Sequence, residues 1–262
     1  MRLTVVGYAG SFPGPDSPAS CYLLEAEGFR MVLDLGSGAL GPLQRHVRLN
    51  DVDAVCISHL HVDHYMDMCP YWVVRNYAPG GTPPPIPVYG PAGTANRLAL
   101  AYGLDPDPGM TRVFDFVTLS PGRREIGPFS VTAGHVNHPV ETFGFRIEYG
   151  GRALAYSADT GESATLAELA RSADVLLCEA SFIDRPGLPA NLHLTGRGAG
   201  EHAARAGAGH LVLTHLTPGN DPACTLAEAQ SAFGGTVSLA SADRVIDLGG
   251  DGPLAPSAAS PR

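Results

Sequence analysis

Residues 58–64 read Ser-His-Leu-His-Val-Asp-His, which places three imidazoles and a carboxylate within six consecutive positions. The run before them, Val52–Ile57, is apolar and rich in β-branched side chains, so it predicts a short buried strand that ends at this cluster. Zn²⁺ and similar divalent ions prefer imidazole and carboxylate ligands. A lone histidine is usually a surface residue or a hydrogen-bonded core residue, but that interpretation does not account for such a cluster. The segment therefore predicts a metal site at the end of a strand.

The spacing within this segment favours two ions. In a loop that leaves a strand, His59 and His61 can point to one side and close on one ion. Asp63 and His64 begin the next turn of the chain, from which they can face a second ion nearby.

The His-x-His-x-Asp-His pattern resembles the signature of the metallo-β-lactamase superfamily. The resemblance implies a third histidine, a bridging aspartate and a last histidine, each from a strand end further along the chain. His138, Asp159 and His215 stand at those places in the expected order, and His135 remains an alternative for the third histidine. Ala158 departs from the family pattern, which usually has glycine there; we expect a tighter loop and no lost ligand.

The likeness covers roughly residues 3–248, and it implies an α/β fold, a four-layer αββα sandwich whose two similar halves bring their ligands to one edge. Apolar runs predict the strands Leu3–Val6, Tyr22–Glu25, Met31–Leu35, Arg112–Leu119, Phe129–Ala133, Thr142–Glu148, Arg152–Ser157, Asp174–Glu179, His210–Thr214 and Val245–Leu248. The predicted helices are Leu40–Leu49, Tyr65–Tyr77, Thr165–Ser172, Thr195–Ala206 and a last helix opened by a capping box at Thr225–Glu228.

Length and composition are those of one large globular domain. With 262 residues and 44% hydrophobic side chains, the chain can bury an ample core. We assign residues 1–248 to the metallo-β-lactamase-fold domain, and we expect residues 249–262, rich in Gly, Pro, Ala and Ser, to be a disordered tail. No apolar run approaches the ~20 residues of a membrane span, and the N-terminal run breaks too early for a signal peptide. Together with five scattered cysteines, these features predict a cytoplasmic protein without a membrane partner.

The net charge of the chain and its basic residues limit the kinds of molecule that it is expected to bind. The net charge is −9, every basic side chain is an arginine, and Arg123-Arg124 is the longest basic run. Nucleic acids are held through many Lys and Arg contacts to phosphates, so this balance disfavours them as partners. A small molecule is the expected partner, and the sequence is compatible with a homodimer.

Two short segments offer a proton donor. Residues 178–182 read Cys-Glu-Ala-Ser-Phe and residues 192–195 read Leu-His-Leu-Thr. They resemble the Glu…His pair of the tRNA 3′-processing endonucleases and related phosphodiesterases, which implies that Glu179 orients His193 at the scissile phosphate. A carboxylate partner raises the pKa of a histidine and fixes its tautomer, as a general acid requires. The alternative is that His193 only makes a hydrogen bond at the entry to a helix.

This pair shifts the prediction from β-lactam or thioester hydrolysis towards phosphodiesters. Residues 14–20, 43–46 and 178–181 resemble the actinobacterial phosphodiesterases of this fold that hydrolyse cyclic nucleotides. The ribonuclease Z-like endonucleases have a protruding substrate arm between the third histidine and the bridging aspartate, but here two predicted strands and a hairpin use residues 140–158. We therefore predict hydrolysis of a small phosphodiester, 3′,5′-cyclic AMP or similar, to the 5′-monophosphate. A ribonuclease Z-like enzyme is the alternative, then another hydrolase of the fold, and a non-catalytic partner subunit is least favoured.

The resemblance also implies a role for each residue. The first metal site would contain His59, His61 and His138, the second Asp63, His64 and His215, and Asp159 would bridge them. Asp63 could also take a proton from the attacking water, and His193 would protonate the departing ribose oxygen. The expected cofactors are two divalent ions, Zn²⁺ first, with Mn²⁺ or Fe²⁺ also suited to these ligands. Asp34 either orders the metal loop from behind or is a plain turn residue.

Overall fold

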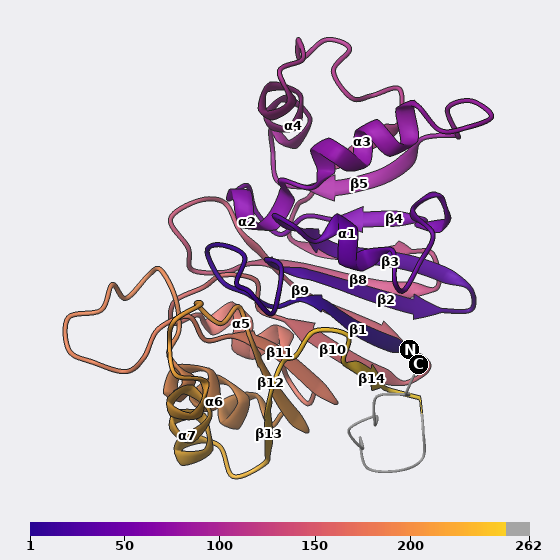
Figure 1. Ribbon diagram of the computed structural model, residues 1–262. Coiled ribbons are helices and arrows are strands. Elements are labelled where there is room, and N and C mark those ends of the chain that lie inside the picture. Colours follow the sequence, from indigo (N-terminus) through magenta and orange to yellow (C-terminus); the bar gives the residue numbers. More distant parts are fainter. Residues whose placement is uncertain (250–262) are drawn as a thin grey trace.

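The computed structural model describes residues 1–249 as two seven-stranded mixed sheets packed face to face, with helices on both outer faces (Figure 1). The first sheet has the order β14-β1-β2-β3-β4-β5-β6 and the second the order β13-β12-β11-β10-β9-β8-β7. The four-layer sandwich predicted from the sequence is confirmed.

The bounds of the elements are as follows. The first sheet contains β1 (Arg2–Gly7), β2 (Cys21–Ala26), β3 (Phe29–Leu35), β4 (Ala54–Cys56), β5 (Ile86–Gly90), β6 (Phe114–Thr118) and β14 (Val245–Asp247). The second contains β7 (Gly122–Ile126), β8 (Phe129–His135), β9 (Phe143–Tyr149), β10 (Arg152–Tyr156), β11 (Val175–Glu179), β12 (His210–Thr214) and β13 (Thr236–Leu239). The helices are α1 (Leu40–Leu43), α2 (Val62–Tyr65), α3 (Met68–Asn76), α4 (Thr94–Tyr102), α5 (Ala164–Leu169), α6 (Gly196–Ala206) and α7 (Pro222–Ala232), with a 3₁₀ turn, η1, at Leu49–Asp51.

Most strands of the two sheets are buried on both faces, which explains their continuous apolar sequences. In β3, Met31 and Leu33 pack in the core between the sheets, whereas Val32 and Leu35 pack under the helices of the first half. Leu176 of β11 packs in the corresponding layer beneath the helices of the second half. The core thus has three apolar layers, one between the sheets and one under each group of helices.

Strand direction brings the loops of the site to one end of the sandwich. β3 and β4 run parallel, as do β10, β11 and β12. β8 has the same direction as β10 because each is antiparallel to β9. The carboxyl ends of all these strands therefore lie at one edge of their sheet, where ligands bind in open α/β sheets.

Two predicted helices are wrong in extent. The helix predicted at Leu40–Leu49 ends at Leu43, and the buried residues Val47 and Leu49 lie in the turns that follow it. Gly41 and Pro42 are poor helix formers and disfavour a longer helix. The helix predicted at Tyr65–Tyr77 is two helices, α2 and α3, separated at Asp67. The Asp67 carboxylate accepts the backbone N–H groups of Gly38 and Leu40 at 3.1 and 2.8 Å, which fixes the chain at this break.

The capping box predicted at Thr225–Glu228 is also wrong. α7 begins one turn earlier, with Asp221 as its N-cap and Pro222 in its first turn. Glu228 instead accepts the backbone N–H of Asp184 at 2.8 Å.

The tail predicted at 249–262 lies almost wholly outside the described residues. Within residues 1–249 no helix has both the length and the apolar character needed to span a membrane.

Candidate active site

Loops at one end of the sandwich gather the predicted metal ligands into two groups. The donor atoms of the first group come from His59, His61, His138 and Asp159, and those of the second from Asp63, His64, His215 and again Asp159. Within each group all donor atoms lie within 4.8 Å of one another. These are the two sets predicted from the sequence. His135 lies outside both, with its half-exposed ring 3.3 Å from a Glu141 carboxylate oxygen.

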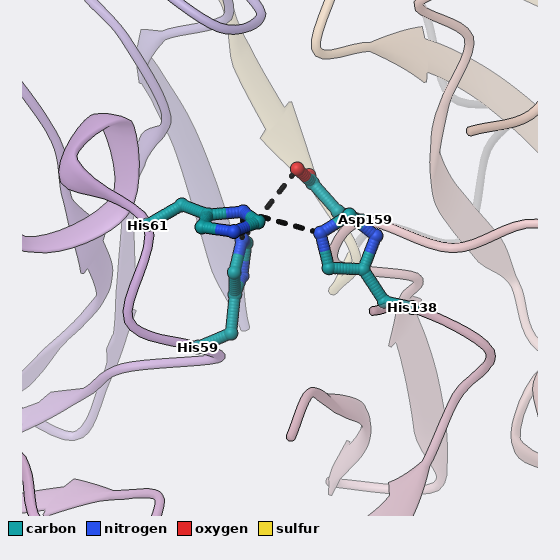
Figure 2. A group of neighbouring side chains, drawn as sticks. All are labelled: His59, His61, His138 and Asp159. Atoms are coloured by element: carbon teal, nitrogen blue, oxygen red, sulfur yellow. Dashed lines mark hydrogen bonds and ion pairs between the residues drawn. The ribbon is translucent and has the colours of Figure 1, made fainter. Parts of the chain in front are cut away.

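The donor atoms of the first group are spaced as a shared ion requires. Ligands at the 2.0–2.1 Å typical of zinc sites are about 3.3 Å apart around a tetrahedral ion. Nδ1 of His61 lies 3.1 Å from Nε2 of His59 and 3.2 Å from Nε2 of His138. Figure 2 shows these rings and the Asp159 carboxylate converging on one another, with His59 and His61 on one loop and His138 and Asp159 on two others.

The second group has the same spacing. Nε2 of His64 lies 3.3 Å from Nε2 of His215 and 3.5 Å from Oδ2 of Asp63. Nε2 of His215 and Oδ2 of Asp63 are 3.1 Å apart. Both groups are therefore able to bind a divalent ion.

Asp159 offers one carboxylate oxygen to each group. Its Oδ2 lies 3.6 Å from Nε2 of His59, and its Oδ1 lies 3.2 and 3.3 Å from Nε2 of His64 and His215. Oδ1 is buried and has no hydrogen-bond partner among the described residues. A buried carboxylate oxygen without a partner is strongly unfavourable, and a cation bound by the second group would satisfy it.

Hydrogen bonds to Nδ1 of three ligand histidines determine which ring nitrogen can bind a metal. Nδ1 of His64 donates to Oδ2 of Asp34 at 2.8 Å, and Nδ1 of His138 donates to the Leu192 carbonyl at 2.9 Å. Nδ1 of His215 donates to Oγ of Ser181 at 2.6 Å. Each bond holds the proton on Nδ1, so Nε2, the atom that these rings turn to their group, keeps its lone pair for a metal.

Asp34 ties the metal loop to both sheets. Its fully buried carboxylate accepts hydrogen bonds from the backbone N–H and hydroxyl of Ser58 at 2.7 and 2.8 Å. It also accepts the hydroxyl of Tyr156 at 2.7 Å, besides the ring of His64. Of the two interpretations left open for Asp34, ordering the metal loop is therefore correct.

His193 and Glu179 form the predicted pair beside the second group. Nδ1 of His193 donates to Oε1 of Glu179 at 3.0 Å, and the same oxygen accepts the backbone N–H of Thr160 at 2.7 Å. Burial alone lowers the pKa of His193, but the hydrogen bond and charge of Glu179 outweigh it and raise that pKa. Since Nδ1 is bound to Glu179, Nε2 is the nitrogen available to a substrate.

Burial and the buried carboxylates shift the pKa values of the histidines at the site. Burial lowers the pKa of His138 to about 4 and that of His59 well below its usual value, so both rings are neutral. Burial also acts to lower the pKa of His64, but the Asp159 and Asp34 carboxylates outweigh it and raise that pKa. No arginine contacts the site residues in the described part of the chain. A bound cation would therefore neutralise these carboxylates.

Three residues of the site have a left-handed backbone that non-glycine residues rarely adopt. They are Asp34, Ala158 and His215, with φ of 54°, 51° and 52°. Ala158, at the position where the resemblance implied glycine, has a positive φ, the region that glycine adopts without steric cost. Such backbone strain is found where surrounding contacts hold a functional loop in place.

The sequence did not predict several hydrogen-bonding partners of the site. The hydroxyl groups of Ser58 and Tyr156 donate to Asp34, and that of Ser181 contacts the ligand His215. Nothing in their neighbouring residues indicates these roles. The loop after β1 borders the site, since the backbone N–H of Ser11 donates to Oδ2 of Asp63 at 2.9 Å. The remaining histidines, His46, His202 and His210, belong to no metal-binding group within residues 1–249.

Residues 30–216 match the family model described as "Beta-lactamase superfamily domain". The chain belongs to this superfamily. A Mycobacterium leprae relative of unknown function is 42% identical over 254 residues, which cover 95% of this chain and 89% of the relative. The probable metallo-hydrolase YhfI of Bacillus subtilis is 30% identical over 92% of this chain and 97% of its own. The crystal structure of YhfI, described as a metallo-β-lactamase-fold protein, matches with a TM-score of 0.82 at 28% identity over 93% of this chain and 98% of YhfI.

A third relative is a ribonuclease Z of Mycolicibacterium gilvum, 30% identical over 96% of this chain and 94% of its own. With the two donor groups, these relatives identify this superfamily member as a metal-dependent hydrolase. The family and the enzyme class expected from the sequence are confirmed.

Proposed function

We propose that this hydrolase is a cytoplasmic phosphodiesterase that opens the ring of a small 3′,5′-cyclic nucleotide, such as cyclic AMP, to give the 5′-monophosphate. The observation that carries the proposal is the Glu179–His193 pair beside two groups of metal ligands. Donor atoms of Glu179, His193 and His215 lie within 4.8 Å of one another, so a proton donor stands next to the second metal group. Breaking a P–O bond to an alkoxide needs both a centre that activates water and such a donor.

Two divalent ions, Zn²⁺ first among those that suit these ligands, would supply a hydroxide at neutral pH and neutralise charge on the phosphoryl oxygens. The side chains of the protein carry out the proton transfers. Nε2 of His193 gives its proton to the departing ribose oxygen, and Glu179 holds the ring in position and stabilises its charged form. The Asp63 carboxylate accepts the proton of the attacking water.

The segment between His138 and Asp159 supports a small substrate over a precursor tRNA. β9 and β10 occupy it almost completely, and they are joined by a tight turn in which Gly150 and Gly151 both have positive φ. No substrate arm is present between these two ligands. The net charge of −9 and the absence of lysine also disfavour the phosphate contacts that a long RNA requires. Ribonuclease Z activity remains the second candidate, because a relative of that name is 30% identical.

The test is a direct comparison of 3′,5′-cyclic AMP and a precursor tRNA with the same metal-loaded protein in the same buffer. We expect a much higher kcat/KM for the cyclic nucleotide, with AMP phosphorylated at the 5′ position as the product. Efficient cleavage at the tRNA 3′ end together with an inert cyclic nucleotide would refute the proposal and favour the second candidate.

A further inference from the structure

Exposed hydrophobic side chains gather beside the metal ligands. Six large ones are exposed in the described chain, namely Phe12, Val62, Tyr77, Leu100, Tyr102 and Val140. Val62 lies between His61 and Asp63, and Val140 lies two residues after His138. Phe12 directly follows Ser11, whose N–H contacts Asp63. Exposed apolar groups that cluster around a polar centre indicate a surface that binds something.

The contacts of Ser11 fix the position of Phe12. The Ser11 nitrogen lies 2.9 Å from Oδ2 of Asp63 and 3.4 Å from Nε2 of His215. Backbone dimensions keep the Cα atom of the next residue within about 5 Å of that nitrogen. The Phe12 Cα atom is therefore within about 8 Å of the Asp63 carboxylate. Phe12 is 51% exposed and lies close enough to the second metal group for its ring to contact a molecule bound there.

The loop that carries Phe12 is held in one conformation. The Phe12 N–H donates to the Gly10 carbonyl at 2.8 Å, and Ser11 has a φ of 65°, so the chain turns sharply at this point. The Gly10 N–H donates in turn to the Leu216 carbonyl at 3.0 Å, directly after the ligand His215. An aromatic ring on a tethered turn can bind with a smaller entropic penalty than one on a mobile loop.

The chemistry around the site suggests which group would contact Phe12. No arginine contacts the ligands or the Glu179–His193 pair within the described chain, so a second phosphate or an acidic group on the substrate would lack a partner. An aromatic neighbour is present instead: Phe182 packs edge-on against His193, with ring centroids 5.1 Å apart. The substrate that fits has one anionic phosphate next to a flat, weakly polar group, and a nucleobase has that character.

We propose that Phe12 determines substrate specificity by stacking on the base of the nucleotide, with Val62 and Val140 bordering the site beside the first metal group. The proposal rests on the proposed function and adds to it that a base is required for tight binding. Base–aromatic stacking accounts for roughly 5- to 150-fold in affinity when the ring is removed.

The experiment compares cyclic AMP with a base-free analogue, the methyl riboside 3′,5′-cyclic phosphate, in the metal-loaded enzyme. For Phe12→Ala we expect KM for cyclic AMP to rise roughly 5- to 150-fold, with kcat and the metal content unchanged. The base-free analogue should be hydrolysed equally by wild type and variant. Phe12→Tyr, which keeps the ring, should retain the wild-type KM. Tyr77→Ala, which removes another exposed aromatic at the end of α3, serves as the control. An equal change for both substrates, or no change for either, overturns the stacking role.

A separate measurement distinguishes failure of this inference from failure of the proposed function. If wild-type enzyme hydrolyses bis(p-nitrophenyl) phosphate but not cyclic nucleotides, the proposed function is wrong. Calorimetric binding of AMP and ribose 5-phosphate to the metal-loaded protein then tests Phe12 directly. Weaker AMP binding in Phe12→Ala, with ribose 5-phosphate unaffected, supports stacking, whereas equal AMP affinities in the two proteins overturn it.

Discussion

Replacing Asp34 by asparagine tests how strongly one buried carboxylate controls the metal centre. Oδ1 of Asp34 accepts the Ser58 N–H, and Oδ2 accepts the Ser58 hydroxyl, the His64 ring and the Tyr156 hydroxyl. Asparagine has nearly the same volume, and it tolerates the φ of 54° found here better than most residues. The substitution therefore changes the charge and one hydrogen-bonding atom while leaving packing and backbone intact.

The magnitude follows from the donors that the amide would meet. In the better orientation the amide oxygen replaces Oδ2, and its NH₂ group faces the Ser58 N–H, donor against donor. This loses a hydrogen bond to a charged group, worth about 1.5–3 kcal/mol, and leaves buried donors unpaired at about 1–3 kcal/mol each. We expect the free energy of unfolding of Asp34→Asn to fall by about 3–5 kcal/mol. Because the His64 ring loses its carboxylate partner, affinity at the second metal group should fall about 10- to 100-fold.

Urea denaturation with excess chelator measures the change in folding free energy, and titration with a competing chelator measures each metal affinity. Asp16→Asn provides a control, because it makes the same chemical change at an exposed position of the loop after β1. If Asp34→Asn keeps wild-type stability and binds both ions normally, the proposed control of His64 by Asp34 is wrong.

Three further predictions concern the site and its surroundings. The protein should bind about two divalent ions per chain; Asp159→Asn should weaken both sites and His135→Ala neither, as elemental analysis would reveal. His193→Ala should keep its metals yet lose about 10²–10⁴ in turnover, and less with a nitrophenolate leaving group, which needs no proton; an equal loss on both substrates argues against a proton donor. Burial, aided by the charge of Arg244, lowers the pKa of His210 from 6.5 to about 4. As the pH falls, His210 is protonated near pH 6.5 in the unfolded chain but only near pH 4 in the folded chain. The stability that neutral His210 contributes should therefore be fully present above about pH 6.5 and be lost progressively towards pH 4. His210→Gln should show a flatter dependence in urea melts, and identical pH profiles would contradict the shift.

The metal ligands could be predicted because four of them stand in one dense run, His59 to His64, and because the resemblance of that run to a known family implied His138, Asp159 and His215. In the structure His59 follows β4, Asp159 follows β10 and His215 follows β12, so these ligands stand at strand ends as the resemblance implied. The partners that orient these ligands could not be predicted. Tyr156 reaches Asp34 from the opposite sheet, a contact between residues separated by 122 positions, and only the packing of the two sheets determines it.

The missed strands have a different physical cause. β7 reads Gly-Arg-Arg-Glu-Ile and β13 reads Thr-Val-Ser-Leu, and each lies at an edge of the second sheet. An edge strand pairs on one side only, and natural proteins place charged or polar residues there to prevent further pairing. The apolar run that marks a central strand is therefore weakened where the sheet ends.

The start of α7 was predicted wrongly because two helix-start signals lie near each other in the sequence. The Asp221-Pro222 pair acts as the cap because proline fixes the first turn and lacks the N–H that would need a partner.

The same features that build the site make it unfavourable without ions. The left-handed residues Asp34, Ala158 and His215 each add about 1–2 kcal/mol of backbone strain. The unpartnered Oδ1 of Asp159 adds the penalty of a buried carboxylate, and no arginine is near enough to offset it. Ions that bind only the folded chain offset such terms, because a ligand at about a thousand times its Kd stabilises the folded state by about 4 kcal/mol. Ions bound at the two groups would therefore help to hold the two sheets together at this edge, besides supplying the proposed chemistry.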